Sequence, residues 1–419
     1  MVNLSTLEIV VNEQSARFRR QDLSVPREID YEACLKTELI VVITGIRRSG
    51  KSTLLRQFAA KDKNFCYLNF DDERLISFDV SDFSVLMLLW LKLGDFKTIY
   101  LDEVQNVPQW ERFVRRVHDE GYKVFVTGSN SKLLSSELGT HLTGRYRQIE
   151  LYPFSFCEYL QLRKISTKNI TTTTKQAKIL HAFDAYLLHG GFPYYCKTKE
   201  RSFLTMLYDN ILYKDVLFRF AIREKKAFRE LANYAMTNVG KEFSYENLAK
   251  TLQLKSSTTV KDYLSNMEEA YLLYMLSKYD FSLKKQHVSN KKLYAIDNGL
   301  RNLVAFSFSG DSGRLLENAV FIELKRRNSE SELYFHRDKR ECDFILRKGA
   351  SIVQAVQVCE QLTPENRQRE IGGLLEALER YKLPRGAIVT KDAELTEKHG
   401  KKHVDIVPAW KWFLGNSSL

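Results

Sequence analysis

Length, composition and charge exclude several classes of protein. The chain has 419 residues, more than one hydrophobic core usually serves, so we expect about two to four domains. Hydrophobic residues make up 44% and charged residues 28%, which argues against a disordered chain, and the net charge of +12 favours an anionic ligand such as a nucleotide or nucleic acid.

Three short apolar runs dominate the first part of the chain, at residues 39–44, 98–101 and 122–127. They do not alternate with polar residues and are rich in β-branched or aromatic side chains, which is typical of strands buried on both faces of a parallel sheet. Trp110, Phe113, Val114 and Val117 have the spacing of one helix face between the last two runs. The order strand, helix, strand predicts an α/β layered fold.

The apolar stretch at residues 83–93 is far shorter than the roughly 18 residues of a membrane-spanning helix. The N-terminal residues lack the basic-then-apolar order of a secretory signal. The cysteines have no zinc-ligand spacing, so reduced thiols are expected. We therefore expect a soluble, cytoplasmic protein that does not contact a membrane.

The second half is expected to change character several times. Residues 176–227 are predicted to be mainly helical, and residues 228–300 to form short helices followed by a lysine-rich hairpin. A helix is then expected at 315–326, strands near 333–335, 342–346 and 352–358, a helix around 371–378, and strands at 387–390 and 404–407. This pattern predicts a second α/β unit.

A phosphate-binding motif follows the first predicted strand. GIRRSGKS matches GxxxxGK[ST] between a predicted strand and a predicted helix. Glycines let backbone N–H groups surround phosphate oxygens, the lysine reaches the β- and γ-phosphates, and the serine hydroxyl ligates Mg²⁺. The expected ATP-binding residues are Gly45, Ile46, Arg47, Arg48, Ser49, Gly50, Lys51, Ser52 and Thr53.

Two acids end the second predicted strand, in the sequence IYLDE. Asp102 is expected to hold Mg²⁺ together with Ser52, and Glu103 to orient and deprotonate the attacking water. The alternative is a surface pair of acids at a strand end. The spacing of the two motifs, on neighbouring predicted strands, favours a Mg²⁺-dependent ATPase over that alternative.

Two further catalytic groups are predicted with their alternatives left open. Ser129 or Asn130, after the third strand and between the acid-bearing and phosphate-binding strands, is expected to reach the γ-phosphate or the attacking water; a plain turn is the alternative. Arg145, in the sequence LTGRYR, is expected to neutralise transition-state charge in the same or a neighbouring subunit. A structural ion pair is the other interpretation of Arg145.

These motifs together resemble those of a known family. GIRRSGKSTLL, IYLDEVQNVPQWE, FVTGSNSKLLSSEL, LTGRYRQIELYPFSFCEYL, GGFP, YAIDNGLRN, GRLLENAVFIEL and ECDFIL are similar to segments of AAA+ P-loop ATPases of bacteria and archaea that carry a C-terminal domain of unknown function. The resemblance implies an ATPase domain at 1–165, a helical lid at 166–227, a winged helix at 228–300 and a restriction-endonuclease-like α/β domain at 301–419.

An endonuclease fold of that type requires an Asp on one strand and Glu-x-Lys on the next strand, often with a Glu on a preceding helix. Glu317 and Asp343 are at the expected places, but Gln357 and Cys359 stand where Glu and Lys are needed. A neutral amide is a poor Mg²⁺ ligand and a thiol cannot replace an ammonium. We therefore expect a degenerate site, with a nucleotide-dependent nuclease as the less favoured function.

Residues 244–269 have the pattern of a helix-turn-helix, and four lysines follow in SLKKQHVSNKK: Lys284, Lys285, Lys291 and Lys292. A basic wing beside such a helix pair indicates contact with the phosphates of double-stranded DNA. A protein-binding winged helix or a solvated hairpin are the alternatives. The sequence thus predicts an ATP-driven switch or motor that acts on DNA or on a protein, or a slow ATPase that serves as a scaffold; oligomers are compatible with either.

Overall fold

The computed structural model describes residues 2–20, 22–62, 64–129, 142, 144–305 and 312–415. The chain forms two compact units, one comprising Met1–Tyr152 with Glu269–Tyr271 and the other comprising Pro153–Glu268 with Leu272–Leu419. Asn130 and Thr143 lie outside the described residues. The finer division into four domains stays a prediction.

The first unit is built around a five-stranded parallel sheet. Its strand order is β2-β3-β4-β1-β5, and every adjacent pair is parallel. The elements in chain order are α1 (Leu4–Arg20), α2 (Tyr31–Lys36), β1 (Ile40–Thr44), α3 (Lys51–Ala59), β2 (Phe65–Asn69), η1 (Glu73–Leu75), α4 (Asp82–Leu93), β3 (Thr98–Asp102), η2 (Val104–Asn106), α5 (Trp110–Asp119), β4 (Lys123–Thr127) and β5 (Tyr146–Glu150). The predicted strands and the predicted helix before β4 are confirmed.

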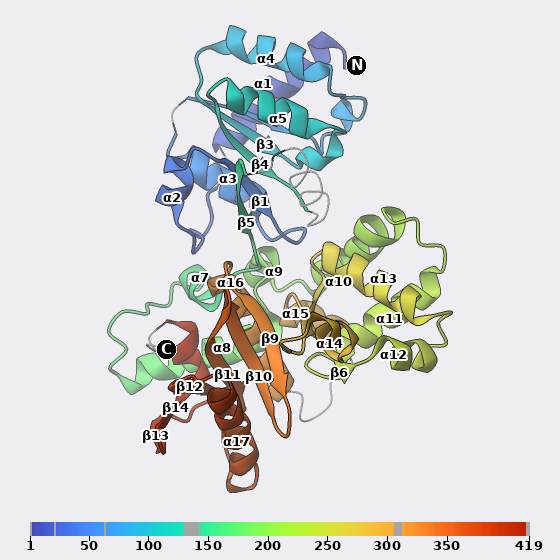
Figure 1. The fold of residues 1–419 in the computed structure, drawn as a ribbon. Helices are drawn as coiled ribbons and strands as arrows, with labels where there is room; N and C mark the ends of the chain where they lie inside the picture. The colour runs from blue at the N-terminus through green and yellow to red at the C-terminus, as the bar shows by residue number, and fades with distance from the viewer. Residues whose placement is uncertain are drawn as a thin grey trace. The chain divides into compact units, whose positions relative to one another are not determined.

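Both faces of this sheet are covered by helices (Figure 1). Val42 of β1 and Leu101 of β3 pack with α1, α4 and α5, whereas Val41 of β1 and Tyr100 of β3 pack with α2 and α3. Successive side chains of a strand point to opposite faces, so a strand buried on both sides is apolar throughout. This burial explains the absence of polar alternation in the three runs.

The second unit contains two sheets. Its elements are α7 (Phe156–Leu162), α8 (Thr173–His189), α9 (Pro193–Thr198), α10 (Arg201–Asn210), η3 (Ile211–Phe218), α11 (Lys225–Thr237), β6 (Glu242–Phe243), α12 (Tyr245–Thr251), α13 (Ser257–Glu269), β7 (Leu273–Ser277), α14 (Leu283–Val288), β8 (Lys291–Ala295), α15 (Asn298–Val304), α16 (Ser312–Arg327), β9 (Glu332–Arg337), β10 (Glu341–Lys348), β11 (Ser351–Val358), α17 (Pro364–Arg380), β12 (Arg385–Thr390), β13 (Leu395–His399), β14 (Lys402–Pro408) and α18 (Ala409–Phe413). The strand β13 was not predicted.

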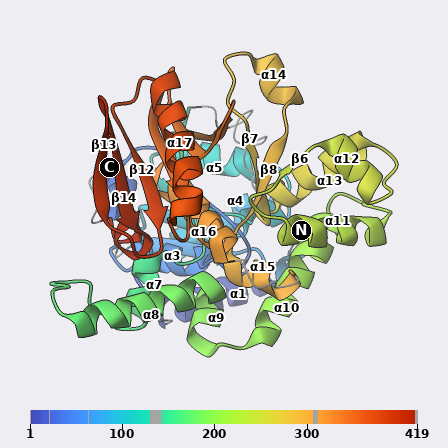
Figure 2. The same cartoon turned by 90° about the horizontal axis from the view of Figure 1, so that it is seen from below.

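The smaller sheet has the order β6-β8-β7 and is antiparallel. It lies beside α11, α12 and α13 (Figure 2). Val260, Leu264 and Met267 of α13 are buried as the helix-turn-helix pattern predicts, and Ser256 caps that helix by accepting the N–H of Thr259. The predicted lysine-rich hairpin is different, because the short helix α14 stands between β7 and β8.

The larger sheet has the order β13-β14-β12-β11-β10-β9 and mixes parallel and antiparallel pairs. One face packs on α17 through Ile371, Leu374 and Leu378. This is the mixed α/β domain expected at the C-terminus.

Candidate active site

Residues 45–50 form a tight loop between β1 and α3. Gly45 (φ +137°) and Gly50 (φ +103°) adopt backbone conformations that side chains disfavour. A Cβ atom at Gly45 would lie 2.2 Å from the carbonyl oxygen of Leu151, so a larger residue does not fit there. α3 begins at Lys51, and the N–H groups of a first helical turn have no intrahelical acceptor. The loop and the helix dipole therefore favour an anion at this place.

Lys51 lies across this loop. Its side chain is buried, and its Nζ donates to the carbonyl oxygens of Gly45 (3.0 Å) and Ile46 (3.3 Å). The same ammonium is 3.7 Å from a carboxylate oxygen of Glu103. Two of its partners are neutral carbonyls, which the oxygens of a phosphate can replace with a stronger, charge-assisted bond.

Two serines of the motif have different surroundings. Ser49 is buried, and its Oγ has no hydrogen-bond partner among the described residues. Ser52 hydrogen-bonds Asp102 through its side chain. A hydroxyl and a carboxylate are the oxygen ligands that Mg²⁺ prefers, and Mg²⁺ usually keeps waters and phosphate oxygens as its other ligands. Among the described residues, no group of three or more His, Cys, Asp or Glu is arranged to hold a metal ion.

Asp102 is fully buried at the end of β3. It accepts hydrogen bonds from the hydroxyls of Thr127 and Tyr67, the latter at 3.2 Å. Burial and then the negative charge of Glu103 raise the pKa of Asp102 above its ordinary value, and the bonds from Thr127 and Ser52 offset only part of this. A metal cation bound beside Asp102 would lower the cost of keeping its carboxylate ionised.

Glu103 follows in a left-handed conformation, with φ +52°. Its N–H donates to Thr127 Oγ1 at 2.9 Å, and its carboxylate accepts from Gln105 at 2.6 Å and from Ser129. Burial alone raises the pKa of Glu103, but the charges of Lys51 and Arg47 and these hydrogen bonds together lower it. Glu103 is therefore ionised at neutral pH, as a base must be.

The strand β4, the last of the three predicted runs, contributes more residues to the site than was predicted. β4 lies between β3 and β1, so the two motif-bearing strands are not direct neighbours, and side chains at the end of β4 bond the two acids at the end of β3. Ser129 is buried and bonds Glu103, whereas Thr127, which was not singled out, bridges Asp102 and the N–H of Glu103. The signal was available: Thr127 is the last residue of the apolar run that precedes Ser129.

Arg145 lies at the opposite edge of the sheet. It precedes β5, its carbonyl accepts the N–H of Ile40 at the start of β1, and its guanidinium pairs with Asp119 at 3.0 Å. Parallel strands begin at one edge and end at the other, so Arg145 is separated from the loop by the length of β1, about 3.3 Å per residue. This placement corrects the expectation of an arginine finger within the same subunit.

Arg27 was missed by the sequence reasoning. Its buried guanidinium donates to the carbonyl oxygen of Ser49 at 2.8 Å and to that of Tyr152 at 2.6 Å. It thereby ties the phosphate loop to the end of the first unit. Arg27 belongs to no motif and lies before β1, so only the tertiary structure reveals the contact.

In the second unit, Lys292 is not the exposed wing lysine that was expected. It is buried, and its Nζ contacts carboxylate oxygens of Glu341 (2.6 Å), Asp343 (3.2 Å) and Glu317 (3.3 Å). Burial lowers the pKa of Lys292, but Tyr294 and these acids raise it well above its ordinary value. The ammonium of Lys292 therefore lies between Glu317 and Asp343, the two acids at which an endonuclease-like fold would bind a metal.

Gln357 and Cys359 fill structural positions beside this cluster. Gln357 accepts the N–H of Asp343 at 3.2 Å and donates to Glu370 at 2.6 Å. Burial raises the pKa of the Cys359 thiol to about 11, which keeps it protonated at neutral pH. Neither side chain provides the charge that nuclease chemistry needs.

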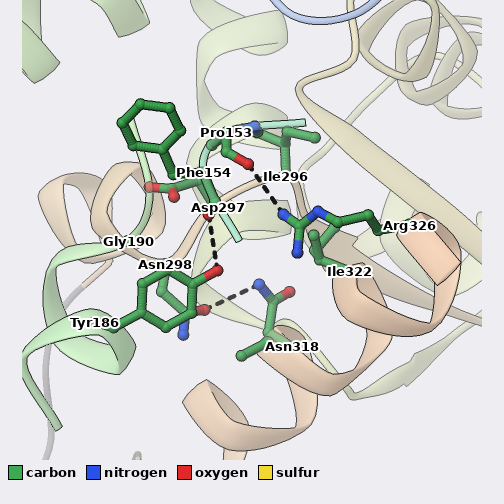
Figure 3. Close-up of a pocket in the computed structure, with 11 residues that line it drawn as sticks. Pro153, Phe154, Tyr186, Gly190, Ile296, Asp297, Asn298, Asn318, Ile322 and Arg326 are labelled. Atoms are coloured by element: carbon green, nitrogen blue, oxygen red, sulfur yellow. Dashed lines mark hydrogen bonds between the residues drawn. The ribbon is translucent and has the colours of Figure 1, made fainter. Parts of the chain in front are cut away.

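The GGFP and YAIDNGLRN segments meet around Asp297 (Figure 3). Asp297 accepts the N–H groups of Gly191 (2.6 Å) and Leu300 (3.0 Å), and Asn318 donates to Asn298 at 2.9 Å. The cavity at this place has a volume of about 20 Å³, room for roughly one water. Buried hydrogen bonds thus join the two motifs around a cavity with little free space.

Three family models match successive parts of the chain. Residues 37–160 match an AAA domain, residues 180–310 a domain of unknown function (DUF8612), and residues 312–412 another domain of unknown function (DUF4143). An uncharacterised protein of Methanocaldococcus jannaschii is 36% identical over 404 residues, covering 92% of this chain and 90% of its own length. An uncharacterised protein of Haemophilus influenzae is 32% identical over 395 residues, covering 90% and 95%.

Solved structures give a weaker likeness. The Aeropyrum pernix Orc1 protein in complex with DNA aligns over 72% of this chain and 91% of its own, at 10% identity and a TM-score of 0.29. AMPPCP-bound DnaA from Aquifex aeolicus aligns over 57% and 86%, at 14% identity and a TM-score of 0.23. Within the described residues, no helix has the length and apolar character required to cross a membrane.

Proposed function

Since this chain belongs to the family of bacterial and archaeal proteins that join an AAA domain to a C-terminal domain of unknown function (DUF4143), we propose that it binds ATP with Mg²⁺ and hydrolyses it. One observation carries the proposal. Lys51, Ser52, Asp102 and Glu103 meet at the edge of one sheet, although β4 separates the two strands that bring them there.

The residues of the loop hold the triphosphate in this proposal. Lys51 exchanges its bonds to loop carbonyls for bonds to the β- and γ-phosphates, and the first-turn N–H groups of α3 bond phosphate oxygens. Ser52 and Asp102 hold Mg²⁺, which, when bound, neutralises phosphate charge. Arg27 keeps the loop in place through the Ser49 carbonyl.

Glu103 orients the attacking water and takes its proton. Its pKa is below the ordinary value, so it is available as a base at neutral pH. Ser129 and Gln105 fix the direction of the carboxylate by hydrogen bonds. Arg145 as a finger supplied to a neighbouring subunit stays a prediction.

The assay is release of phosphate from ATP with Mg²⁺ and with excess chelator. We expect turnover that stops with the chelator and falls in Ser52→Ala, while the control Ser166→Ala, an exposed serine of the second unit, behaves as the wild type. Turnover that is unaffected by the chelator would contradict the assignment of Ser52 and Asp102.

For the partner, we propose that ATP turnover is coupled to DNA or to a protein bound through a winged helix formed by α11–α13 and the β6-β8-β7 sheet. Lys292 is buried and Lys291 is half-buried, so Lys284 and Lys285 on α14 are the wing lysines exposed to a partner. Phe281, at 73% exposure, lies beside them. Two exposed lysines suit contact with the phosphates of a duplex backbone.

Binding to duplex DNA at several salt concentrations tests this coupling. Replacement of Lys284 and Lys285 by Gln is expected to reduce the slope of log K against log salt by about 2, because each phosphate contact contributes about 0.9. The matched control replaces Lys164 and Lys168, both exposed, by Gln. Equal loss in both variants would favour a protein partner.

A further inference from the structure

The second unit contains a large groove between α7, α8 and α9, helices that lie together in Figure 2. Its volume is about 680 Å³, within the range of small-molecule sites. The lining residues are Tyr159, Arg163, Ile165, Thr174, Ala177, Lys178, His181, Ala182, Ala185, His189 and Lys199. Of these residues only Tyr159 lies in a motif discussed above, and the ATPase site does not use it.

Positive charge is concentrated around it. Arg163, Lys178 and Lys199 are cations at neutral pH, two histidines stand with them, and none of the lining residues is acidic. Among the described ion pairs, none includes Arg163, Lys178 or Lys199. The protein as described thus leaves these charges uncompensated by carboxylates.

The cations also act on one another. Burial, and then the charges of Lys199 and Arg163, lower the pKa of His189. Burial lowers the pKa of Lys199; nearby Cys196 opposes this shift, and Arg163 adds to it. An anion placed in the groove would remove this repulsion.

The partial negative charges of the nearby helix C-termini offset only part of the positive charge around the groove. Arg163 and Lys199 are the C-cap residues of α7 and α9, and His189 is the last residue of α8. Each helix C-terminus carries at most about half a negative charge, so three termini offset about one and a half of the three positive charges. A net positive potential remains.

The floor of the groove is apolar. Ile165, Ala177, Ala182 and Ala185 line it, and the buried ring of Tyr159 lies below Arg163, whose guanidinium carbon is 5.4 Å from the ring centroid. Small alanines on α8 leave space above the helix. A bound molecule would therefore meet apolar surface below and cations at the rim.

We propose that this groove binds a small organic anion that carries at least two negative charges and an apolar portion. The number of rim cations sets the charge, the alanine floor requires the apolar portion, and the volume limits the size. The site is separate from the phosphate loop and does not depend on ATP hydrolysis.

The test uses 2-naphthyl phosphate, followed by its fluorescence and by calorimetry, on the full chain carrying Lys51→Ala to weaken binding at the phosphate loop. We expect saturable binding that Lys178→Gln with Lys199→Gln weakens about tenfold or more, because charge-assisted bonds are lost. Lys175→Gln, which removes one positive charge from α8 outside the groove, should leave binding unchanged. 2-Naphthol and inorganic phosphate should each bind more weakly.

Absence of binding, or equal affinity in the double variant and the wild-type groove, would overturn the proposal. Tighter binding of a poly-glutamate peptide than of naphthyl phosphate would also overturn it, and would indicate a protein segment as the occupant. Equal thermal unfolding midpoints of the variants would show that an altered affinity does not come from misfolding.

Discussion

Two clusters in this molecule place a buried lysine near carboxylates, and they differ in what the lysine touches. Lys51 bonds two backbone carbonyls and stays 3.7 Å from Glu103. Lys292 contacts three carboxylates at 2.6–3.3 Å. The first ammonium has weak partners that a ligand can replace, and the second already has strong ones.

The difference teaches that residue types alone do not define a site. A lysine held by three acids compensates charge within the fold, and exchanging those bonds for a ligand would leave buried carboxylates unpaired. A lysine held by loop carbonyls loses little when a phosphate arrives. The lysine of the first unit can therefore exchange its partners for a ligand, whereas the lysine of the second unit belongs to an ion cluster of the fold.

The sharpest way to extend the comparison is Glu103→Gln. An amide cannot accept the proton of the attacking water, so we expect turnover to fall by about 10³-fold, within the usual range for a general base. Binding of ATP should persist, because the change keeps the shape of the side chain. Phosphate release and calorimetry measure the two quantities, and wild-type turnover would remove Glu103 from the role of base.

Lys292→Met should act on stability. Removal of the ammonium leaves Glu317, Glu341 and Asp343 facing one another, and breaking a buried ion pair costs about 3–5 kcal/mol. Denaturant unfolding measures this loss. A variant as stable as the wild type would mean that the cluster does not support the fold, and the comparison would fail.

Asp297→Asn should have a smaller cost. Gly191 and Leu300 donate to different oxygens of Asp297, and an amide offers only one oxygen, so one buried N–H would face an NH₂ group. The expected loss is about 1–3 kcal/mol in the free energy of unfolding. Asn318→Asp, which replaces an amide by a carboxylate in the same cluster, is the control. Comparison of the two losses in the free energy of unfolding shows whether the loss is specific to replacing a carboxylate by an amide.

The stability difference between the wild type and Asp297→Asn should also depend on pH, in a direction that follows from the pKa of Asp297. Burial raises the pKa of Asp297 from 3.8 to about 6, so the folded state binds the proton more tightly than the unfolded state. The contribution of Asp297 to stability is therefore greatest below pH 3.8 and declines as the pH rises to about 6. The difference between wild type and Asp297→Asn should shrink over that interval; a difference that grows would contradict it.

The smallest effect is expected for Arg145→Gln. The Arg145–Asp119 pair is partly exposed, and such pairs contribute about 1 kcal/mol or less. Turnover should stay within about twofold of the wild type if the pair is only structural. A loss of about 10³-fold at unchanged stability would instead identify a finger that acts on a neighbouring subunit.

The sequence predicted the elements that local rules determine. Runs buried on both faces, such as the one that ends at Thr127, are apolar without alternation and were placed correctly. The loop with Lys51 was found because its glycines and lysine must occur at fixed spacing. The order of helices and strands after residue 315 predicted a second α/β unit, and the resemblance to a family agreed with it.

The remaining features depend on contacts between distant segments. Arg27 contacts the phosphate loop although it belongs to no motif. Lys292 is buried because it pairs with acids that follow it in the chain, on α16 and β10. Arg145 follows the loop motifs in sequence but lies at the other edge of the sheet. Periodicity and spacing carry no information on such pairings, so these three residues required the tertiary structure.

Calorimetric titration of Mg·ATP into Lys51→Ala and Lys292→Met tests the central distinction most directly. We predict that Lys51→Ala loses ATP affinity by about 100-fold or more, since bonds of an ammonium to two phosphates are lost, while Lys292→Met binds as the wild type. Undiminished uptake by Lys51→Ala would contradict a triphosphate site in the loop between β1 and α3.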